Sequence, residues 1–92
     1  MTETLQIGIL FFPNVTQLDA MGPAQVLSRL PGAKMHMIWK NRDPVTTDSG
    51  FAVLPTTTFA DCPQLDVICV PGGAGQVALM NDEETLAFLR RQ

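Results

Sequence analysis

The residue best suited to handle a proton in this sequence is Asp19, in the stretch QLDAMGP. Its neighbours Leu18, Ala20 and Met21 are apolar. A carboxyl group in a partly dry pocket has a pKa that its surroundings can tune, so that it serves as a proton donor or acceptor. An aspartate just before a proline-started helix is more often a helix-entry or turn residue that does no chemistry. The residue by itself leaves both interpretations open.

A second candidate is the glycine-rich stretch PGGAG, residues 71–75, which follows the apolar run LDVICV. Glycines leave backbone N–H groups unshielded, so one of these amides could face an anion or a developing oxyanion. The same residues could simply turn the chain sharply. The stretch lacks the spacing of GxGxxG and the Gly-Lys-Ser/Thr of a phosphate-binding loop, so a nucleotide site is not favoured.

The remaining reactive residue types indicate structure rather than chemistry. Cys62 and Cys69 have no histidine or second cysteine pair at ligand spacing, so no metal site is predicted. Cys69 is interpreted as a small buried hydrophobe, and a disulfide is not expected in a reducing cytosol. His36, the only histidine, is interpreted as structural or surface. Asp66 is expected to bond local backbone, and three further residues are interpreted as turn or cap residues: Asp48, Asp61 and Asp82.

The composition limits the classes of protein that need be considered. A chain of 92 residues suits one small domain, and 46% hydrophobic with 16% charged residues is typical of a globular protein. The net charge is −3 and no basic cluster exists beyond Arg90 and Arg91, so no nucleic-acid partner is expected. The apolar run IGILFF is too short to span a bilayer. We therefore expect a cytoplasmic protein with no membrane partner.

Several stretches have the pattern of β structure. The apolar runs LQIGILFFP and LDVICV, residues 5–13 and 65–70, predict strands that are buried on both faces of a parallel sheet. AKMHMIWK, residues 33–40, alternates in polarity and predicts a strand nearer an edge than the first strand. PVTTDSGFAVLP, residues 44–55, predicts a hairpin that turns at DSG. The TTTFADCP stretch after it is expected to be a polar connection.

Two helices are predicted. The first is GPAQVLSRLPG, residues 22–32, with Pro23 at its first position, and the second is NDEETLAFLRRQ, residues 81–92, with Asn81 as N-cap. The resulting order of strands and helices predicts an open α/β sheet. Ligands bind such sheets at the carboxyl ends of the strands. The loop that carries Asp19 and the PGGAG loop both lie there.

The stretches IGILFFPNVTQLDAMGPAQVL and VTTDSGFAVLPTTTFADCPQLDVICVPGGAG together resemble the N-terminal half of the ThiJ/PfpI superfamily of glutamine-amidotransferase-like proteins. The resemblance covers nearly all of the chain. It implies an α/β, flavodoxin-like sandwich with a mostly parallel sheet, of which residues 1–92 would be the N-terminal part of one domain. It also implies a homodimer. Within the superfamily, the sequence is most similar to the branch that hydrates isonitriles.

The resemblance implies a mechanism and roles for particular residues. In this branch a cysteine thiolate attacks the isonitrile carbon, an acid supplies a proton, and water releases an N-substituted formamide, without a metal or organic cofactor. Asp19 matches the acid, and the backbone at Gly73, with Gly72, matches the turn that lies next to the thiol. The elbow that carries the nucleophile is expected on the next strand, beyond Gln92. Neither cysteine of this chain matches it, so the 92 residues are expected to be inactive alone.

Other functions of the same superfamily stay open at this point. The expected partner is a small-molecule substrate, and the alternatives include enzymes of the glyoxalase-like, deglycase or peptidase type. They also include ligand-sensing domains fused to AraC-type regulators, in which the pocket binds without turnover. A remnant without activity is a further alternative. The sequence that follows the last helix would distinguish them, since an enzyme needs the cysteine elbow and a regulator needs a DNA-binding region.

Overall fold

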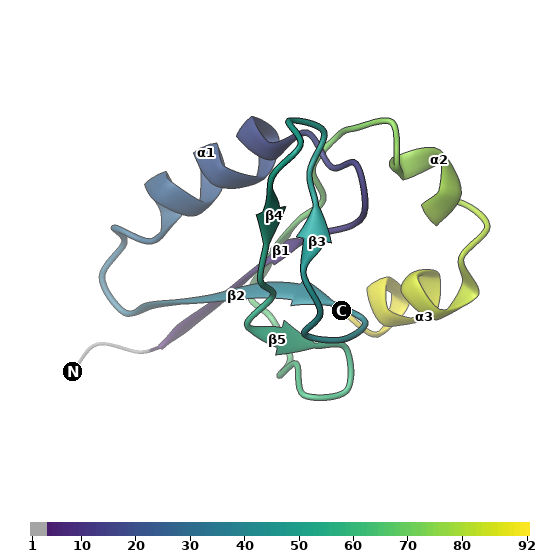
Figure 1. Cartoon of the computed structure of the whole chain (residues 1–92). Helices are drawn as coiled ribbons and strands as arrows, with labels where there is room; N and C mark the ends of the chain where they lie inside the picture. The colour runs from purple at the N-terminus through teal and green to yellow at the C-terminus, as the bar shows by residue number, and fades with distance from the viewer. Residues whose placement is uncertain (1–3) are drawn as a thin grey trace.

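The computed structural model describes residues 4–92. Figure 1 shows a sheet flanked by helices, with a separate two-stranded hairpin beside it. Along the chain the elements are β1 (Leu5–Leu10), α1 (Gln17–Leu27), β2 (Ala33–Trp39), β3 (Val45–Thr46), β4 (Ala52–Val53), β5 (Thr57–Thr58), β6 (Val67–Cys69), α2 (Gln76–Leu79) and α3 (Glu83–Arg91).

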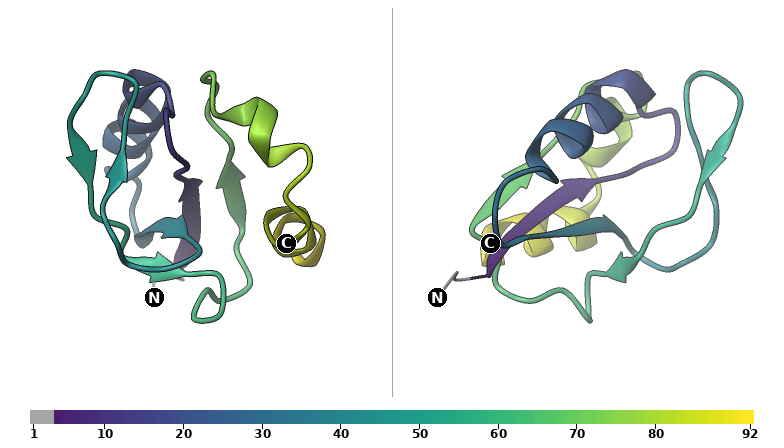
Figure 2. Two further views of the ribbon diagram at one scale, coloured as in Figure 1. Left: turned by 45° about the vertical axis from the view of Figure 1, so that its right-hand side comes forward. Right: turned by 90° about the vertical axis from the view of Figure 1, so that its left-hand side faces the viewer.

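The main sheet has the strand order β5-β2-β1-β6, and each neighbouring pair is parallel. The predicted hairpin forms as well, because β3 and β4 pair antiparallel. Helices α1 and α3 lie on opposite sides of the sheet (Figure 2). The predicted α/β class with a parallel sheet is therefore confirmed.

Strand β1 lies at the centre of the core, as its apolar run predicts. Ile7 and Ile9 are fully buried, and burial continues past the end of the strand through Phe11 and Phe12. Gly8 leaves room for the side chains of Ile38 and Leu65, since a Cβ placed on it would lie 2.6 Å from an atom of each. The apolar run thus supplies both the middle strand and the aromatic residues that lead into the following loop.

The prediction for residues 65–70 is wrong in its extent and in its burial. Strand β6 covers only Val67–Cys69 and, within residues 4–92, pairs with β1 alone. Val67 and Val70 are 40% and 41% exposed. The physical reason is that a strand with one neighbour leaves an edge, and side chains along that edge are covered from one side only.

Strand β2 is not at an edge, because β5 pairs with it on the side away from β1. The polar stretch TTTFADCP therefore contains a strand that the sequence pattern did not reveal. Its Phe59 is buried and stacks on Phe88 of α3, with ring centroids 4.5 Å apart. This connection contributes to the core as well as to the sheet.

Helix α1 begins at Gln17, well before the predicted start, and Pro23 lies inside it. Proline is common at the first helical position, which is the basis of the incorrect prediction. Inside a helix, Pro23 has no N–H to donate to the carbonyl of Asp19 four residues earlier. Because α1 begins at Gln17, Asp19 lies in the first turn of the helix rather than in a loop.

The N-cap of α3 is Asp82, one residue beyond the predicted Asn81. The Asp82 carboxylate accepts a hydrogen bond from the Thr85 backbone N–H, in keeping with the prediction that Asp82 is a cap or turn residue. Lys40, just after β2, forms an ion pair with the same carboxylate. The hydrogen bond from Lys40 is the main reason that the pKa of Asp82 is lowered. These contacts attach the start of α3 to the sheet.

His36 is a buried structural residue that joins three strands, and it is 7% exposed. Its Nε2 lies 2.6 Å from the side-chain oxygen of Gln6 on β1, and its Nδ1 lies 3.0 Å from the hydroxyl oxygen of Thr57 on β5. A neutral imidazole can serve both contacts, donating at one nitrogen and accepting at the other. The structural interpretation of His36 is confirmed.

The buried His36 makes stability depend on pH. Burial, with a smaller effect of Lys34, lowers the pKa of His36 below 6.5, so the folded state favours the neutral ring more than the unfolded state does. This contribution is fully present above about pH 6.5 and is lost as the pH falls below that value. We expect the urea concentration at the midpoint of unfolding to be lower at pH 5.5 than at pH 7.5. We expect His36→Gln to reduce this difference. An equal fall in both proteins would contradict the assignment to His36.

Candidate functional site

At the carboxyl end of the sheet, the loop after β1 lies between the β3–β4 hairpin and the PGGAG turn. Val15 forms a parallel bridge with Thr47 of the hairpin and an antiparallel bridge with Gly73 of the PGGAG turn. Val15 is fully buried between them. The loops after β1 and β6 therefore meet, as expected for the carboxyl ends of neighbouring parallel strands.

Backbone hydrogen bonds hold both edges of this loop. On the hairpin side, the Asn14 N–H donates to the Thr46 carbonyl at 2.8 Å. On the glycine side, the Thr16 N–H donates to the Gly72 carbonyl at 3.0 Å. The position of residues 14–16 is thus set by two segments that lie far away in the sequence.

Asp19 and the glycine turn lie next to each other. A Cβ placed on Gly72 would lie 3.1 Å from Asp19 Oδ2, so the carboxylate lies against this glycine. The Asp19 N–H donates to the Thr16 carbonyl at 3.0 Å, which connects the acid to the same loop. We call Asp19, Gly72 and Gly73 the acid–glycine site. Asp19 is exposed, so residues 4–92 do not form the partly dry pocket that was expected around it.

The glycines of the turn are required by close backbone packing. Gly73 has φ 137°, and a Cβ on it would lie 2.7 Å from Thr16 N and 2.8 Å from Asn14 O. Only glycine combines this backbone conformation with this approach. A Cβ on Gly75 would lie 1.8 Å from Pro13 O. The turn is therefore pressed against the loop that leads to Asp19.

The Gly73 amide is directed away from the loop against which the turn packs. The bond from Thr16 to Gly72 flanks the antiparallel bridge of Val15 and Gly73. A bridge flanked in this way is a non-hydrogen-bonded pair, in which the N–H groups of the two paired residues face outward. The Gly73 N–H therefore points away from Val15.

Neither cysteine has the character of a nucleophile. Burial raises the pKa of Cys62, and burial together with the negative charge of Asp19 raises the pKa of Cys69. A thiol with a raised pKa stays protonated at neutral pH and reacts slowly, because the thiolate is the reactive form. Both are free thiols and both are only half-buried, so the prediction that Cys69 is a small buried hydrophobe is wrong as to its burial.

The other acidic residues have structural contacts. The Asp66 carboxylate accepts from the Gln6 N–H at 2.8 Å, and the Asp66 N–H donates to the Gln6 carbonyl at 2.8 Å. Its partner is on a neighbouring strand, so the expectation of a local bond is wrong although the structural role holds. Asp61 forms an ion pair with Arg42 at 3.1 Å.

Asp48 has a contact that the sequence did not reveal. From the hairpin turn, its carboxylate accepts a hydrogen bond from the backbone N–H of Gln17, the first residue of α1, at 3.2 Å. The sequence pattern marked Asp48 only as a turn residue. No local signal identifies its partner, because the two residues lie 31 positions apart.

A separate cavity of about 290 Å³ lies beside β6, between α2 and α3. Its lining is almost entirely apolar: Val70, Gln76, Leu79, Met80, Leu86 and Leu89. It offers a single polar side chain and does not include the acid–glycine site. In the described part of the chain, no three His, Cys, Asp or Glu side chains gather as a metal site would require.

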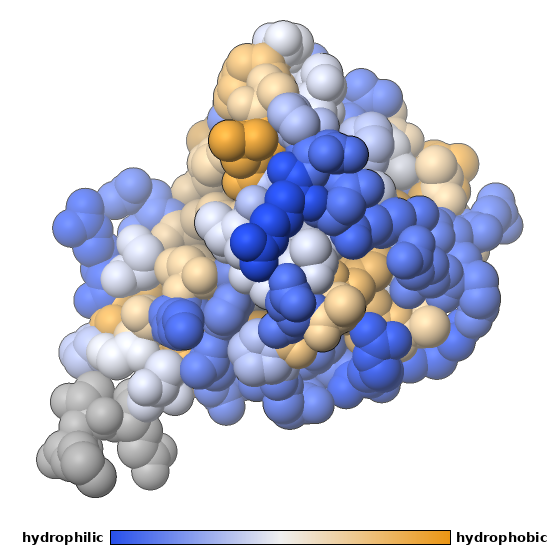
Figure 3. Space-filling model, turned by 60° about the horizontal axis from the view of Figure 1, so that its bottom comes forward, coloured by the Kyte–Doolittle hydropathy of each residue, from blue (hydrophilic) through white to orange (hydrophobic). Residues whose placement is uncertain are grey.

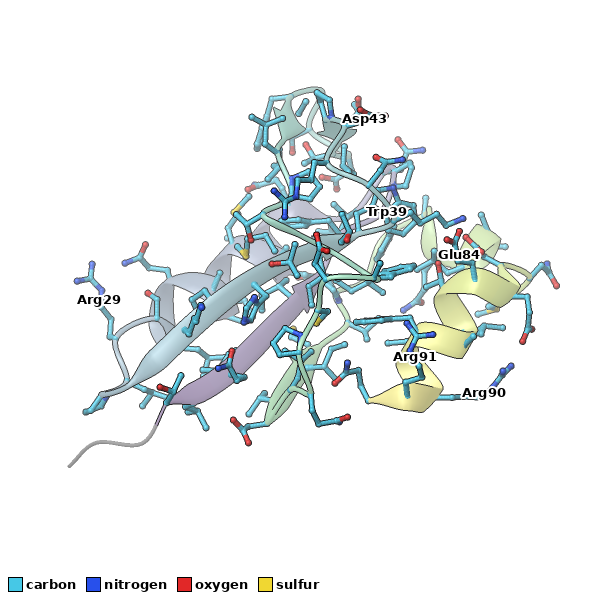
Figure 4. All side chains as sticks on the ribbon, turned by 90° about the horizontal axis from the view of Figure 1, so that it is seen from below. Arg29, Trp39, Asp43, Glu84, Arg90 and Arg91 are labelled. Atoms are coloured by element: carbon cyan, nitrogen blue, oxygen red, sulfur yellow. The ribbon has the colours of Figure 1, made fainter. Side chains whose placement is uncertain are left out.

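The face in Figure 3 is largely hydrophilic and is interrupted by separate hydrophobic patches. In Figure 4, Arg29 lies at the opposite end of the molecule from Arg90 and Arg91. Among the helices of residues 4–92, none has the length and the apolar composition that crossing a membrane requires.

The parallel α/β sheet and the site at its carboxyl end define a domain of a known class. Residues 6–92 match the DJ-1/PfpI family, and the chain belongs to this family. It is 59% identical over 88 residues to the isonitrile hydratase of Pseudomonas putida, a match that covers 96% of this chain and 39% of that enzyme. The predicted superfamily is therefore confirmed.

Solved structures give the same result for the fold. A ThiJ/PfpI family protein from Pseudomonas syringae superposes with a TM-score of 0.88 at 45% identity, over 92% of this chain and 36% of that one. DJ-1beta from Drosophila melanogaster superposes with a TM-score of 0.82 at 23% identity, over 96% of this chain and 48% of that one, and shows the fold alone. The flavodoxin-like fold is confirmed, and the chain spans less than half the length of each of these relatives.

Proposed function

We propose that this chain is part of an enzyme that adds water to an isonitrile and releases an N-substituted formamide. The observation that carries the proposal is the 59% identity to an isonitrile hydratase across 96% of the chain. The chain corresponds to 39% of that enzyme's length. The remaining catalytic group, a cysteine, is proposed to come from a part of the protein that these 92 residues do not include.

The proposed reaction divides the hydration into two additions. The cysteine thiolate forms a carbon–sulfur bond to the terminal isonitrile carbon, and that carbon takes a proton from Asp19. Water then adds to the same carbon, the carbon–sulfur bond breaks, and the thiolate is regenerated. The product is R–NH–CHO, and every atom comes from the isonitrile and one water. Of the two protons of the attacking water, one goes to the nitrogen and the other returns to Asp19.

The acid–glycine site has a geometry that supports these roles. The Asp19 carboxylate lies against Gly72, so a thiol that approached the glycine turn would also meet the acid. The Gly73 N–H faces away from Val15 and can donate to negative charge at the reacting centre. Exposure of Asp19 in this chain leaves its outer side open to another segment of the protein.

Two further features belong to the proposal. We place the enzyme in the cytoplasm, since Cys62 and Cys69 of this chain are free thiols, as is usual in a reducing compartment. We also propose a homodimer. Helix α1 supports it, because Leu18 and Val26 are 68% and 70% exposed and lie about two turns apart on the helix.

The test is turnover of an alkyl isonitrile by the complete protein that the gene encodes. We expect NMR to detect the N-alkyl formamide, and iodoacetamide treatment to abolish its formation because the thiol is blocked. Residues 1–92 alone are expected to form none. Absence of formamide with the complete protein would refute the substrate class. Turnover that survives complete thiol alkylation would refute the cysteine mechanism.

A further inference from the structure

Helix α1 receives its N-terminal cap from another element. Among residues 4–92, the N-cap position Thr16 makes no side-chain capping bond. Asp48, from the turn of the β3–β4 hairpin, instead accepts from the Gln17 N–H at 3.2 Å through Oδ1. A carboxylate at this place satisfies a backbone N–H that the helix leaves unbonded, and it complements the positive end of the helix dipole.

The same hairpin holds the loop that leads into the helix. The Asp48 N–H donates to the Val15 carbonyl at 2.9 Å, and the Asn14 N–H donates to the Thr46 carbonyl at 2.8 Å. Asp48 therefore contacts the chain through its backbone just before α1 and through its side chain at the first residue of α1. The opposite edge of this loop bonds to the glycine turn.

The turn that presents Asp48 is itself well fixed. Thr47 is 2% exposed, and both its N–H and its hydroxyl donate to the Phe51 carbonyl, at 2.8 Å and 2.9 Å. Gly50 closes the turn with φ 85°. The Ser49 hydroxyl donates to Asp48 Oδ1 at 3.3 Å. The carboxylate is thus held from within the hairpin as well as by the helix.

The first turn of α1 depends on this cap because it lacks one of its own bonds. Pro23 cannot donate to the Asp19 carbonyl, so the turn that carries Asp19 has one fewer helical hydrogen bond. Asp19 is the third residue of α1, two positions after the capped Gln17. The direction of the acid relative to Gly72 therefore follows from how the start of the helix is held.

We propose that Asp48 is a positioning residue, and that the β3–β4 hairpin uses it to hold the acid of the active site against the glycine turn. The link to catalysis rests on the proposed function, because it takes Asp19 as the acid. The structural part concerns the bonds at Gln17 and Thr16 and stands without it. Asp48 is expected to act through Asp19 and not to touch the substrate.

The experiment compares Asp48→Ala, which removes the acceptor, with Asp48→Asn, which keeps a side-chain oxygen at the same place. Asp43→Ala, which removes a carboxylate just before the same hairpin (Figure 4), is the control. In the complete protein, NMR hydrogen exchange is measured at the Gln17 and Thr16 amides, and kcat and KM are measured for isonitrile hydration.

We expect Asp48→Ala to speed exchange at Gln17 about fivefold, the usual effect of losing an N-cap. We expect it to lower kcat about tenfold with KM unchanged, since a misplaced acid weakens the chemical step and not binding. Asp48→Asn is expected to restore both quantities to within about twofold of the original. The control is expected to change neither.

Each other outcome has a definite meaning. Unchanged exchange at Gln17 in Asp48→Ala would show that the cap is absent. Faster exchange with unchanged kcat would show that Asp48 supports the helix without positioning the acid. If the unaltered protein hydrates no isonitrile, the proposed function fails and Thr16 decides the structural part. Faster Thr16 exchange in Asp48→Ala then supports control of the contact with Gly72, and unchanged exchange overturns it.

Discussion

Asp19→Asn is expected to lower kcat for isonitrile hydration by about 10²–10⁴-fold, the usual contribution of a positioned acid or base. The amide has nearly the shape of the carboxyl group, so the contact with Gly72 is retained. It has no carboxylic proton to deliver to the isonitrile carbon. KM is therefore expected to change little. Formamide production by the complete protein, followed at several isonitrile concentrations, separates the two constants.

The control for this change is Asp61→Asn. Asp61 is an exposed partner of Arg42 and is not part of the acid–glycine site, so its replacement removes the same charge elsewhere on the molecule. We expect kcat within about twofold of the original for this variant, because exposed ion pairs contribute little. If Asp19→Asn behaved like the control, Asp19 would not be the acid.

Gly75→Ala is expected to lower the free energy of unfolding by about 3 kcal/mol, at the upper end of what overpacking costs. A Cβ at this position would lie 1.8 Å from Pro13 O and 3.0 Å from Pro13 C, and these are backbone atoms that no rotamer change can move. Gly75 has φ −65°, which alanine adopts readily, so the expected loss comes from the clash and not from backbone conformation. Urea unfolding of the complete protein measures it.

Gly50→Ala provides the comparison for that loss. Gly50 has φ 85°, and among the described residues nothing lies within 4 Å of the Cβ that would be added. Its replacement is expected to cost about 1 kcal/mol, from backbone conformation alone. A Gly75→Ala protein as stable as Gly50→Ala would mean that the glycine turn does not pack against the loop after β1 as closely as described.

The sequence was sufficient for the elements whose signals are strong and local. The apolar run of β1 identified the central strand, and DSG identified the hairpin turn. The last helix was found with its cap displaced by one residue. The short strand β5 could not be predicted from the sequence. Strand β5 has two residues and no apolar pattern, so only its pairing with β2 makes it a strand.

The sequence names candidate residues for the site but not the segments that support them. Asp19 and the glycines stood out by type and position, and the structure brings Asp19 against Gly72. The helix start predicted at Pro23 is wrong, because α1 begins at Gln17 and Pro23 lies inside it. The hairpin caps the helix at Gln17 through Asp48. A single sequence cannot reveal such a partner, since nothing near Gln17 indicates Asp48.

Val15 lies between two segments that are distant in the sequence, and this affects when its contacts form during synthesis. Val15 pairs with Thr47 and with Gly73, so its burial requires two contacts between residues that lie far apart in the sequence. At ribosomal rates of about 5–20 residues per second, the glycine turn is synthesised several seconds after Val15. During that interval the loop beside the acid has no partner on its glycine side. The contact between Asp19 and Gly72 therefore forms only after the turn that follows β6 has been synthesised.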